Sequence, residues 1–288
     1  MAGSDPGHFR FSIMKISRLA RRYGTEIVMD EGRNGIHRSA ARGFSAKADI
    51  YARGRPDYPD VIVDWLRDRL GLDDGRSVID LGAGTGKFTA YLLKTGAQVI
   101  AVEPVREMRA KIVQAQPNVV TYDGTATSIP LPDDSVDAVT CAQAFHWFAT
   151  REALAEIRRV LKPGGKLGLV WNVRDESVDW IKALTAIITP YEGDTPRYAN
   201  GAWRRVFPAN GFSSLQEEHF PHRHVGSPDE TIIDRVCSTS FIAALPADEM
   251  AKIVTQLRAL IAATPELAGK NTISVPYSTA AYWTEKEG

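Results

Sequence analysis

The stretch that most constrains the fold covers residues 78–89 and reads VIDLGAGTGKFT. A run of apolar residues surrounds Asp80, then Gly82, Gly84 and Gly86 alternate with other residues, and a helical pattern begins. Glycines let a chain turn sharply and let a ligand approach the backbone without meeting a Cβ atom. The helix that follows presents free N–H groups at its start. The stretch therefore predicts a strand, a glycine turn and a helix, with a ligand at the turn.

Strand and helix patterns alternate on both sides of this turn. Such alternation is typical of βαβ units, in which helices cover both faces of a parallel sheet. Strands are expected at 77–81, 98–103, 119–122, 136–142 and 166–171, and helices at 60–70, 87–94, 105–114 and 152–161. Later helices are expected at 179–188, 229–236 and 247–263, and later strands at 212–222 and 271–284, the last interrupted at Pro276.

The second strand ends at Glu103, about twenty residues after the turn, where an acid accepts hydrogen bonds from ribose hydroxyls. A dinucleotide fingerprint needs a third glycine where this chain has Lys87 or Thr89. A phosphate-binding P-loop needs glycine at Leu81 and Ser or Thr at Phe88. The pattern that remains is D-x-G-x-G-x-G, which favours a nucleoside ligand other than a dinucleotide or nucleoside triphosphate.

This pattern resembles the first motif of the class I S-adenosylmethionine (SAM) methyltransferases. SAM fits the chemistry because it carries an amino acid end and a ribose but no phosphate. The resemblance implies that Asp80 lies near the ammonium group of SAM and that Glu103 binds the ribose diol. It also implies that the backbone at Gly82, Gly84 and Gly86 surrounds the methionine part.

Three further segments extend the resemblance. Residues 135–143 are similar to the family's fourth strand, 159–165 to the approach to its fifth strand, and 124–132 to its adenine-flanking loop. The family often places an acid in that loop against the adenine amino group, whereas this chain has Thr125, so we expect backbone contacts there instead. The resemblance thus adds these expected cofactor contacts: Pro104, Met108, Thr125, Ala126 and Gln143.

A finer similarity involves the arm at 51–59 (YARGRPDYP) and the segment 143–148 (QAFHWF). Together they resemble the small-molecule methyltransferases grouped with trans-aconitate methyltransferase, over roughly residues 44–284. This resemblance implies an α/β, Rossmann-like, doubly wound seven-stranded sheet that is mostly parallel, with an antiparallel C-terminal strand.

Several residues near these motifs are candidates for the acceptor side of the site, where the molecule that receives the methyl group would bind. His146 follows the fourth strand and is either a general base or a hydrogen-bonded wall residue. Trp147 and Trp171 either flank the sulfonium cation or pack in the core. Tyr51 and Arg55 belong to an arm that closes over the cofactor in the resembled family, and the alternative is a solvated loop.

Composition narrows the range of partners. The 288 residues include 35 Lys and Arg against 35 Asp and Glu, which argues against bulk binding of nucleic acid or an anionic membrane. No apolar run approaches the roughly 20 residues of a membrane span. Cys141 and Cys237 form no disulfide or zinc pattern, and a cytoplasmic setting is expected. His219, His222 and His224 favour a solvated strand edge over a metal site, so no metal is expected.

The domain organisation is expected to have two parts. Residues 1–43 contain Arg10, Lys15, Arg18, Arg21, Arg22, Arg33, Arg38 and Arg42 against Asp5, Glu26, Asp30 and Glu31. We expect a poorly ordered basic tail there, with an organellar transit peptide as the alternative. Residues 44–288 are expected to form one methyltransferase domain, with a SAM-binding core at 77–172 and substrate-side elements at 173–288.

The expected function is in-line transfer of a methyl group from SAM to a small molecule. The acceptor atom belongs to a carboxylate, a hydroxyl, an amine or a carbon acid. Methylation of RNA or protein is an alternative, as is a nicotinamide-dependent oxidoreductase or a non-catalytic nucleotide-binding module.

Overall fold

The structure, a computed structural model, describes residues 54–288; the expected basic tail and Tyr51 lie outside the described residues. The helices of the described part are α4 (Val61–Leu70), α5 (Thr89–Leu93), α6 (Arg106–Ala115), α7 (Arg151–Val160), α8 (Asp179–Ile188), α9 (Arg235–Cys237), α10 (Ser240–Ala243) and α11 (Ala247–Ala263). Shorter helical turns are η1 (Phe145–Trp147), η2 (Thr189–Tyr191), η3 (Ala202–Val206) and the π-helical η4 (Asp229–Asp234). The strands are β1 (Ser77–Leu81), β2 (Gln98–Val102), β3 (Val120–Tyr122), β4 (Val136–Ala142), β5 (Leu161–Arg174), β6 (Gln216–Gly226) and β7 (Ile273–Glu285).

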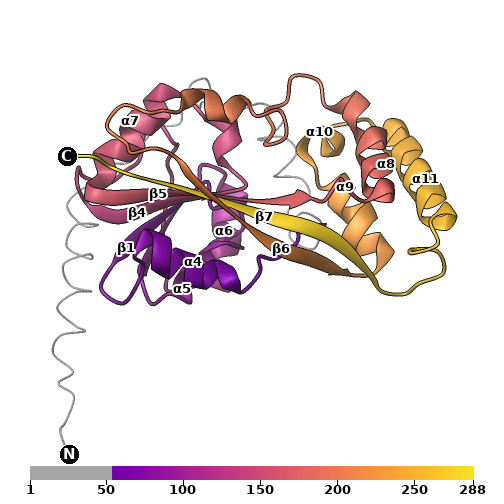
Figure 1. Cartoon of the computed structure of the whole chain (residues 1–288), viewed down its shortest axis with the longest axis horizontal. Coiled ribbons are helices and arrows are strands. Elements are labelled where there is room, and N and C mark those ends of the chain that lie inside the picture. Colours follow the sequence, from indigo (N-terminus) through magenta and orange to yellow (C-terminus); the bar gives the residue numbers. More distant parts are fainter. Residues whose placement is uncertain (1–53) are drawn as a thin grey trace, which may run out of the picture. The chain divides into compact units, whose positions relative to one another are not determined.

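These strands form one seven-stranded sheet in the order β3-β2-β1-β4-β5-β7-β6. Neighbours from β3 to β5 are parallel, whereas β7 runs antiparallel to both β5 and β6. The long β6–β7 pair crosses Figure 1 as the orange and yellow ribbons. The seven-stranded, mostly parallel sheet with an antiparallel last strand is confirmed.

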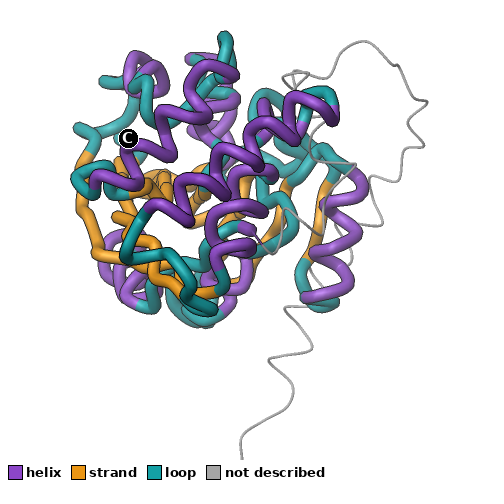
Figure 2. The backbone as a smooth tube through the Cα atoms, turned by 90° about the vertical axis from the view of Figure 1, so that its right-hand side faces the viewer, coloured by secondary structure: helices purple, strands orange, loops and turns teal. Residues whose placement is uncertain are grey.

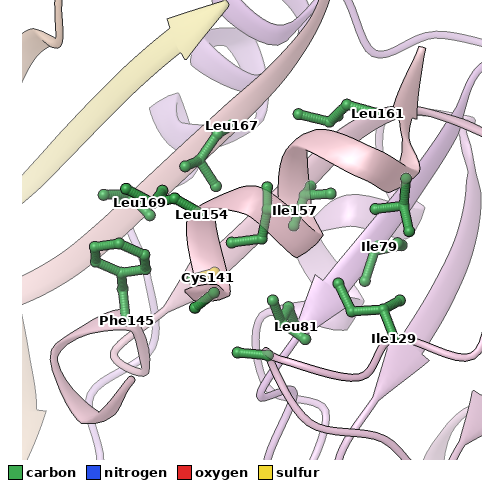
Figure 3. Close-up of a cluster of buried hydrophobic side chains, with 14 of the residues drawn as sticks. Ile79, Leu81, Ile129, Cys141, Phe145, Leu154, Ile157, Leu161, Leu167 and Leu169 are labelled. Carbon is green, nitrogen blue, oxygen red and sulfur yellow. The ribbon is translucent and has the colours of Figure 1, made fainter. Parts of the chain in front are cut away.

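Helices cover both faces of the parallel half of the sheet. On one face, α4 and α5 bury their apolar side chains against β1, β2 and β4. On the other face lies α7, whose Leu154 and Ile157 pack among side chains of β1, β4 and β5 (Figure 3). The start of α7 is fixed by Thr150, whose hydroxyl accepts the N–H of Ala153 at 3.1 Å. The spacing of apolar residues along each helix therefore determines which side turns to the sheet.

A third apolar cluster lies beyond the parallel strands and contains α8, η4, α9, α10 and α11 together with the first half of β7. Figure 1 shows these helices gathered at one end of the β5–β7 pair, and Figure 2 views them from that end, in front of the strands. This cluster lies in the part of the chain where substrate-side elements were expected, and that role stays a prediction. None of the helices within residues 54–288 has both the length and the apolar content needed to cross a membrane.

Three strands differ from the sequence expectation, and one of them is β6, which spans Gln216–Gly226 where a strand was expected at 212–222. Pro276 does not interrupt β7. The pairing of β5 with β7 ends at Tyr277, so the nitrogen of Pro276, which has no hydrogen to donate, has no ladder partner in β5. The carbonyl of Pro276 still accepts the N–H of Asp175 at 3.2 Å. In addition, β5 begins at Leu161, which pairs with Val136, before an irregularity that lets the proline–glycine segment bulge out.

The order of the strands indicates where on the sheet a ligand would bind. The chain moves outward in one direction from β1 to β3 and then in the other from β4, so the direction reverses between β1 and β4. Open α/β sheets bind ligands outside the carboxyl ends of the strands at such a reversal. Asp80 of β1 and Gln143, which directly follows β4, lie on the two sides of it.

Candidate functional site

The glycine turn connects β1 to α5 with an unusual backbone. Gly82, Gly84 and Gly86 all have positive φ, at 71°, 59° and 83°. A Cβ on Gly82 would come within 2.8 Å of the Cβ of Ala144, and a Cβ on Gly86 would come within 3.2 Å of Ile112. Backbone angle and close packing therefore both favour glycine at Gly82 and Gly86, whereas at Gly84 the backbone angle alone does so.

Asp80 lies at the base of the turn and is fully buried. Its Oδ2 accepts a hydrogen bond from the Thr89 hydroxyl at 2.6 Å, while Oδ1 is buried with no hydrogen-bond partner among the described residues. Burial raises the pKa of Asp80 to about 7; the Thr89 hydrogen bond lowers it, and Glu103 raises it further. A carboxylate with one unpartnered oxygen in a cavity wall suits a cation, and the ammonium group of SAM fits this requirement.

Glu103 directly follows β2 and is 5% exposed. Its Oε2 accepts the N–H of Gly84 and its Oε1 accepts the N–H of Val105, both at 2.9 Å. Burial raises the pKa of Glu103, although these two backbone hydrogen bonds and Arg109 act in the opposite direction. Each carboxylate oxygen has a second lone pair, so the side chain is still able to accept hydrogen bonds from the two ribose hydroxyls.

The expected adenine side is built around Met108 and the loop at Thr125. Met108 is buried, with its sulfur 4.0 Å from the place of a Cβ on Gly84. The N–H and the carbonyl of Thr125 both pair with Ser128, so the turn already uses them. The neighbouring Ala126 is buried, and Pro104 is half-buried at the start of the segment that leads to α6.

Gln143 stands where β4 ends and has a positive φ of 59°, which is uncommon for a residue with a side chain. Its N–H donates to the carbonyl of Val170 at 2.8 Å, and this bond to β5 holds the backbone in place. Strained backbone of this kind is concentrated at functional sites. Gln143 lines both of the cavities described next.

The first cavity lies over the glycine turn. Its lining includes Asp80, Gly82, Gly84, Lys87, Gln143 and Arg55. It therefore brings together Asp80, Gly82 and Gly84, which were expected at the methionine part of SAM, whereas the expected Gly86 does not line it. Glu103, Met108, Thr125 and Ala126 do not line this cavity, and their contact with the nucleoside part of SAM stays a prediction.

The second cavity adjoins the first, because Arg55, Gln143 and Arg235 line both. It encloses about 890 Å³ of space, part of which is open to solvent. His146, Trp147 and Trp171 belong to its wall, as the sequence motifs suggested. Tyr51, the remaining expected acceptor-side residue, lies outside the described residues.

Positive charge dominates this second cavity. Its charged lining residues are the cations Arg55, Arg174, Arg197 and Arg235 and the anion Glu176. Arg174 has its Nη2 buried with no hydrogen-bond partner among the described residues. Arg174 and Arg235 both lie close enough to the buried Tyr277 to lower the pKa of its phenol, although burial alone would raise it.

Sequence reasoning missed most of these arginines. Arg174 ends β5, Arg197 lies between η2 and η3, and Arg235 begins α9, so no local motif connects them. The three histidines expected along a solvated strand edge differ in their exposure to solvent. His219 is about half exposed and bonds with Glu217, whereas ring atoms of His222 and His224 are buried. Within residues 54–288, no group of side chains is arranged to hold a metal ion.

The side chains of His146 and Trp171, which both line the second cavity, are hydrogen-bonded to each other. The indole Nε1 of Trp171 donates to Nδ1 of His146 at 3.1 Å. Trp171 is 1% exposed and packs against Trp203, with 4.6 Å between ring centroids. Trp171 is therefore a core residue with an edge in the cavity, and a contact between its ring and the sulfonium cation stays a prediction.

Comparison with known proteins agrees with this geometry. A family model described as a methyltransferase domain matches residues 79–169. An uncharacterized methyltransferase-like protein of Schizosaccharomyces pombe is 41% identical over 246 residues, which is 84% of this chain and 95% of that protein. An uncharacterized methyltransferase of Mycobacterium tuberculosis is 40% identical over 242 residues, with the same coverage of 84% and 95%.

A solved structure also shares the fold. The YcgJ protein of Bacillus subtilis superposes with a TM-score of 0.51 at 24% identity, covering 78% of this chain and 98% of that one. Because relatives at 40% and 41% identity are matched over 95% of their length, this chain belongs to the class I SAM-dependent methyltransferases.

Proposed function

We propose that this methyltransferase acts on a small carboxylic acid and forms its methyl ester. The observation that carries the proposal is the second cavity, in which four arginines face one glutamate. A guanidinium group binds a carboxylate through two parallel hydrogen bonds, so arginines in a cavity favour an anionic ligand. The cavity joins the expected methionine site at Arg55, Gln143 and Arg235, which would bring a bound acid to the reacting methyl group.

The arginines divide between two parts of the cavity. Arg55 and Arg197 act on the pKa of His146, while Arg174 and Arg235 act on that of Tyr277. Arg197 is partly neutralised by its ion pair with Glu192, whereas Arg174 has no carboxylate partner among the ion pairs of the described residues and has the Tyr277 hydroxyl as its neighbour. Its charge is therefore available to a bound acid, and Arg174 is the arginine to test first.

The reaction follows from this arrangement. SAM supplies a methyl group on a positively charged sulfur, which makes the carbon electrophilic. A carboxylate oxygen forms the new bond to the methyl carbon as the carbon–sulfur bond breaks, and that electron pair remains on sulfur. No proton moves, because the nucleophile is already ionised. The protein's part is to hold the oxygen in line, about 3–3.5 Å from the methyl carbon, and to exclude water.

The test is a screen with methyl-labelled SAM against sets of carboxylic acids, phenols, amines, total RNA and mixed protein. We expect labelled product only with acids, and base hydrolysis should release it as labelled methanol, as esters do. Label in phenols, amines, RNA or protein with none in acids would overturn the proposal.

Two variants locate the acid within the cavity. Arg174→Gln should raise the KM for the acid at least tenfold, since hydrogen bonds to a charged group contribute about 1.5–3 kcal/mol, while SAM affinity stays within about twofold. Arg205→Gln is the matched control, because Arg205 is exposed and lies outside the cavity lining. Equal KM values for the two variants would remove Arg174 from the site.

A further inference from the structure

His146 has a neighbour that determines where its proton sits. The residue belongs to η1, between β4 and α7, and lines the second cavity, called the acceptor cavity from here on. Its Nδ1 accepts the indole N–H of Trp171 at 3.1 Å. The indole is held in turn by Trp203 and by Tyr282, with centroid separations of 4.6 and 5.8 Å. The donor is therefore fixed in the core and does not follow movements of the imidazole.

The chemistry of the indole makes this contact directional. An indole nitrogen donates a hydrogen bond and never accepts one, so Nδ1 of His146 must present a lone pair. A neutral imidazole with a lone pair on Nδ1 carries its proton on Nε2. A second proton would have to go to Nδ1, where two N–H groups would then point at each other.

The surroundings oppose the charged imidazole for other reasons as well. Burial is the main cause that lowers the pKa of His146 to about 3, and the nearby guanidinium groups of Arg55 and Arg197 act in the same direction. Arg174, Arg235 and Glu176 are the other charged groups that line the same cavity. The net charge facing the ring is therefore positive, and His146 stays neutral at physiological pH.

We infer that Trp171 holds His146 as the Nε2–H tautomer, so that the imidazole donates a hydrogen bond to the methyl acceptor and does not remove a proton from it. His146 is the residue that touches the acceptor, and Trp171 is a positioning residue that acts through it. The inference rests on the proposed function in taking an anionic oxygen as the acceptor. It explains a preference for acids, because a hydroxyl acceptor would have no base beside it at His146.

The first experiment needs no substrate. The full chain, labelled with ¹⁵N-histidine and saturated with S-adenosylhomocysteine, is studied by two-bond proton–nitrogen correlation spectra, with His146→Gln identifying the signals of His146. We expect the pattern of an imidazole protonated at Nε2 alone, unchanged between about pH 5.5 and 8.5. An Nδ1–H pattern, or titration of His146 within this range, would overturn the inference.

A variant tests the role of the indole. Trp171→Phe removes the N–H donor, and we expect His146 to show a mixture of tautomers and to titrate at a higher pH than in the wild type. Circular dichroism and S-adenosylhomocysteine affinity verify that the variant is folded. If it does not fold, the wild-type spectrum alone still decides the tautomer. A folded variant with an unchanged Nε2–H pattern would show that Trp171 does not control it.

Kinetics test the hydrogen bond to the acceptor, with the acid that the labelled-methyl screen identifies. His146→Gln keeps an N–H donor and should retain kcat/KM within about threefold, whereas His146→Ala should lose about tenfold or more, as expected for a hydrogen bond to a charged group. Equal losses in both variants would contradict hydrogen-bond donation. If no acid is methylated, the proposed function fails, while the spectra still decide the tautomer.

Discussion

The carboxylate of Glu103 accepts the backbone N–H of Gly84 at 2.9 Å, which ties the residue after β2 to the glycine turn after β1. Its other oxygen accepts the N–H of Val105, also at 2.9 Å. One acid therefore holds the turn and the start of the segment that leads to α6, and it is also the residue expected to bind the ribose. Loss of this carboxylate should affect both the shape of the site and its contacts.

Replacement of Glu103 by Gln should raise the Kd for SAM at least tenfold. The amide places an NH₂ donor opposite a backbone N–H donor, and a lost hydrogen bond involving a charged group costs about 1.5–3 kcal/mol. Calorimetric titration with SAM measures the change. Glu107→Gln on the exposed side of α6 is the control and should bind normally. Binding within twofold of wild type by Glu103→Gln would show that the ribose lies elsewhere.

Asp80 should make SAM affinity depend on pH. Its pKa is raised from 3.8 to about 7, chiefly by burial, so the cofactor-free protein favours the neutral acid. The stabilising contribution of that neutral form is complete below pH 3.8 and is lost as the pH rises through about 7. A bound ammonium group favours the carboxylate instead. SAM affinity should therefore rise from about pH 5.5 to 7, by up to about tenfold per unit.

The pH dependence is checked by titration calorimetry at several pH values, with Asp80→Asn beside the wild type. The variant should bind SAM weakly and with little change over this range, because its amide does not ionise. The same slope in the variant and the wild type would assign the pH dependence to another group.

Gly82→Ala should destabilise the protein more than Gly193→Ala does. Both glycines have positive φ, at 71° and 56°, and an L-residue in this region costs roughly 1–2 kcal/mol. A Cβ at Gly193 meets nothing within 4 Å, whereas a Cβ at Gly82 lies 2.8 Å from that of Ala144. Denaturant unfolding should show the smaller loss for Gly193→Ala and an additional loss of about 1–3 kcal/mol for Gly82→Ala. Equal losses would mean that the segment after β4, which carries Ala144, yields to the added methyl group without strain.

Tyr282→Phe should impair acceptor binding while leaving SAM binding intact. The Tyr282 hydroxyl donates to Glu217 at 2.8 Å, accepts from Arg204 at 2.7 Å and lies 2.8 Å from the hydroxyl of Tyr198, which lines the acceptor cavity. Removal of this hydroxyl should cost about 1–3 kcal/mol of unfolding free energy because its partners lose their bonds.

The measurements are denaturant unfolding, the KM of the identified acid and the Kd for SAM. We expect a several-fold higher KM, since the segment that carries Arg197 and Tyr198 is held less firmly. Tyr122→Phe on β3 serves as the control on the cofactor side of the sheet. A change in SAM affinity with an unaltered KM would contradict this account.

Much of the fold could be predicted because its determinants are local. The apolar spacing of 136–142, 179–188 and 247–263 predicted β4, α8 and α11 with the boundaries that the structure has. The last strand was harder: Pro276 suggested an interruption, but its position beyond the paired part of β5 lets β7 continue. Whether a proline breaks a strand depends on the neighbouring strand, and a single sequence does not contain that information.

The cofactor half of the site was determined by the sequence itself. Asp80, the three glycines and Glu103 lie within a short stretch, and backbone sterics together with one βαβ unit are sufficient to bring them together. The acceptor half was decided by the tertiary structure. Arg174, Arg197 and Arg235 come from separate elements, and the tautomer of His146 depends on Trp171 at the far side of a strand pairing. Such groups meet only when β5, β7 and the helices that lie between them in the chain pack together, because long-range burial, and no local pattern, sets their distances.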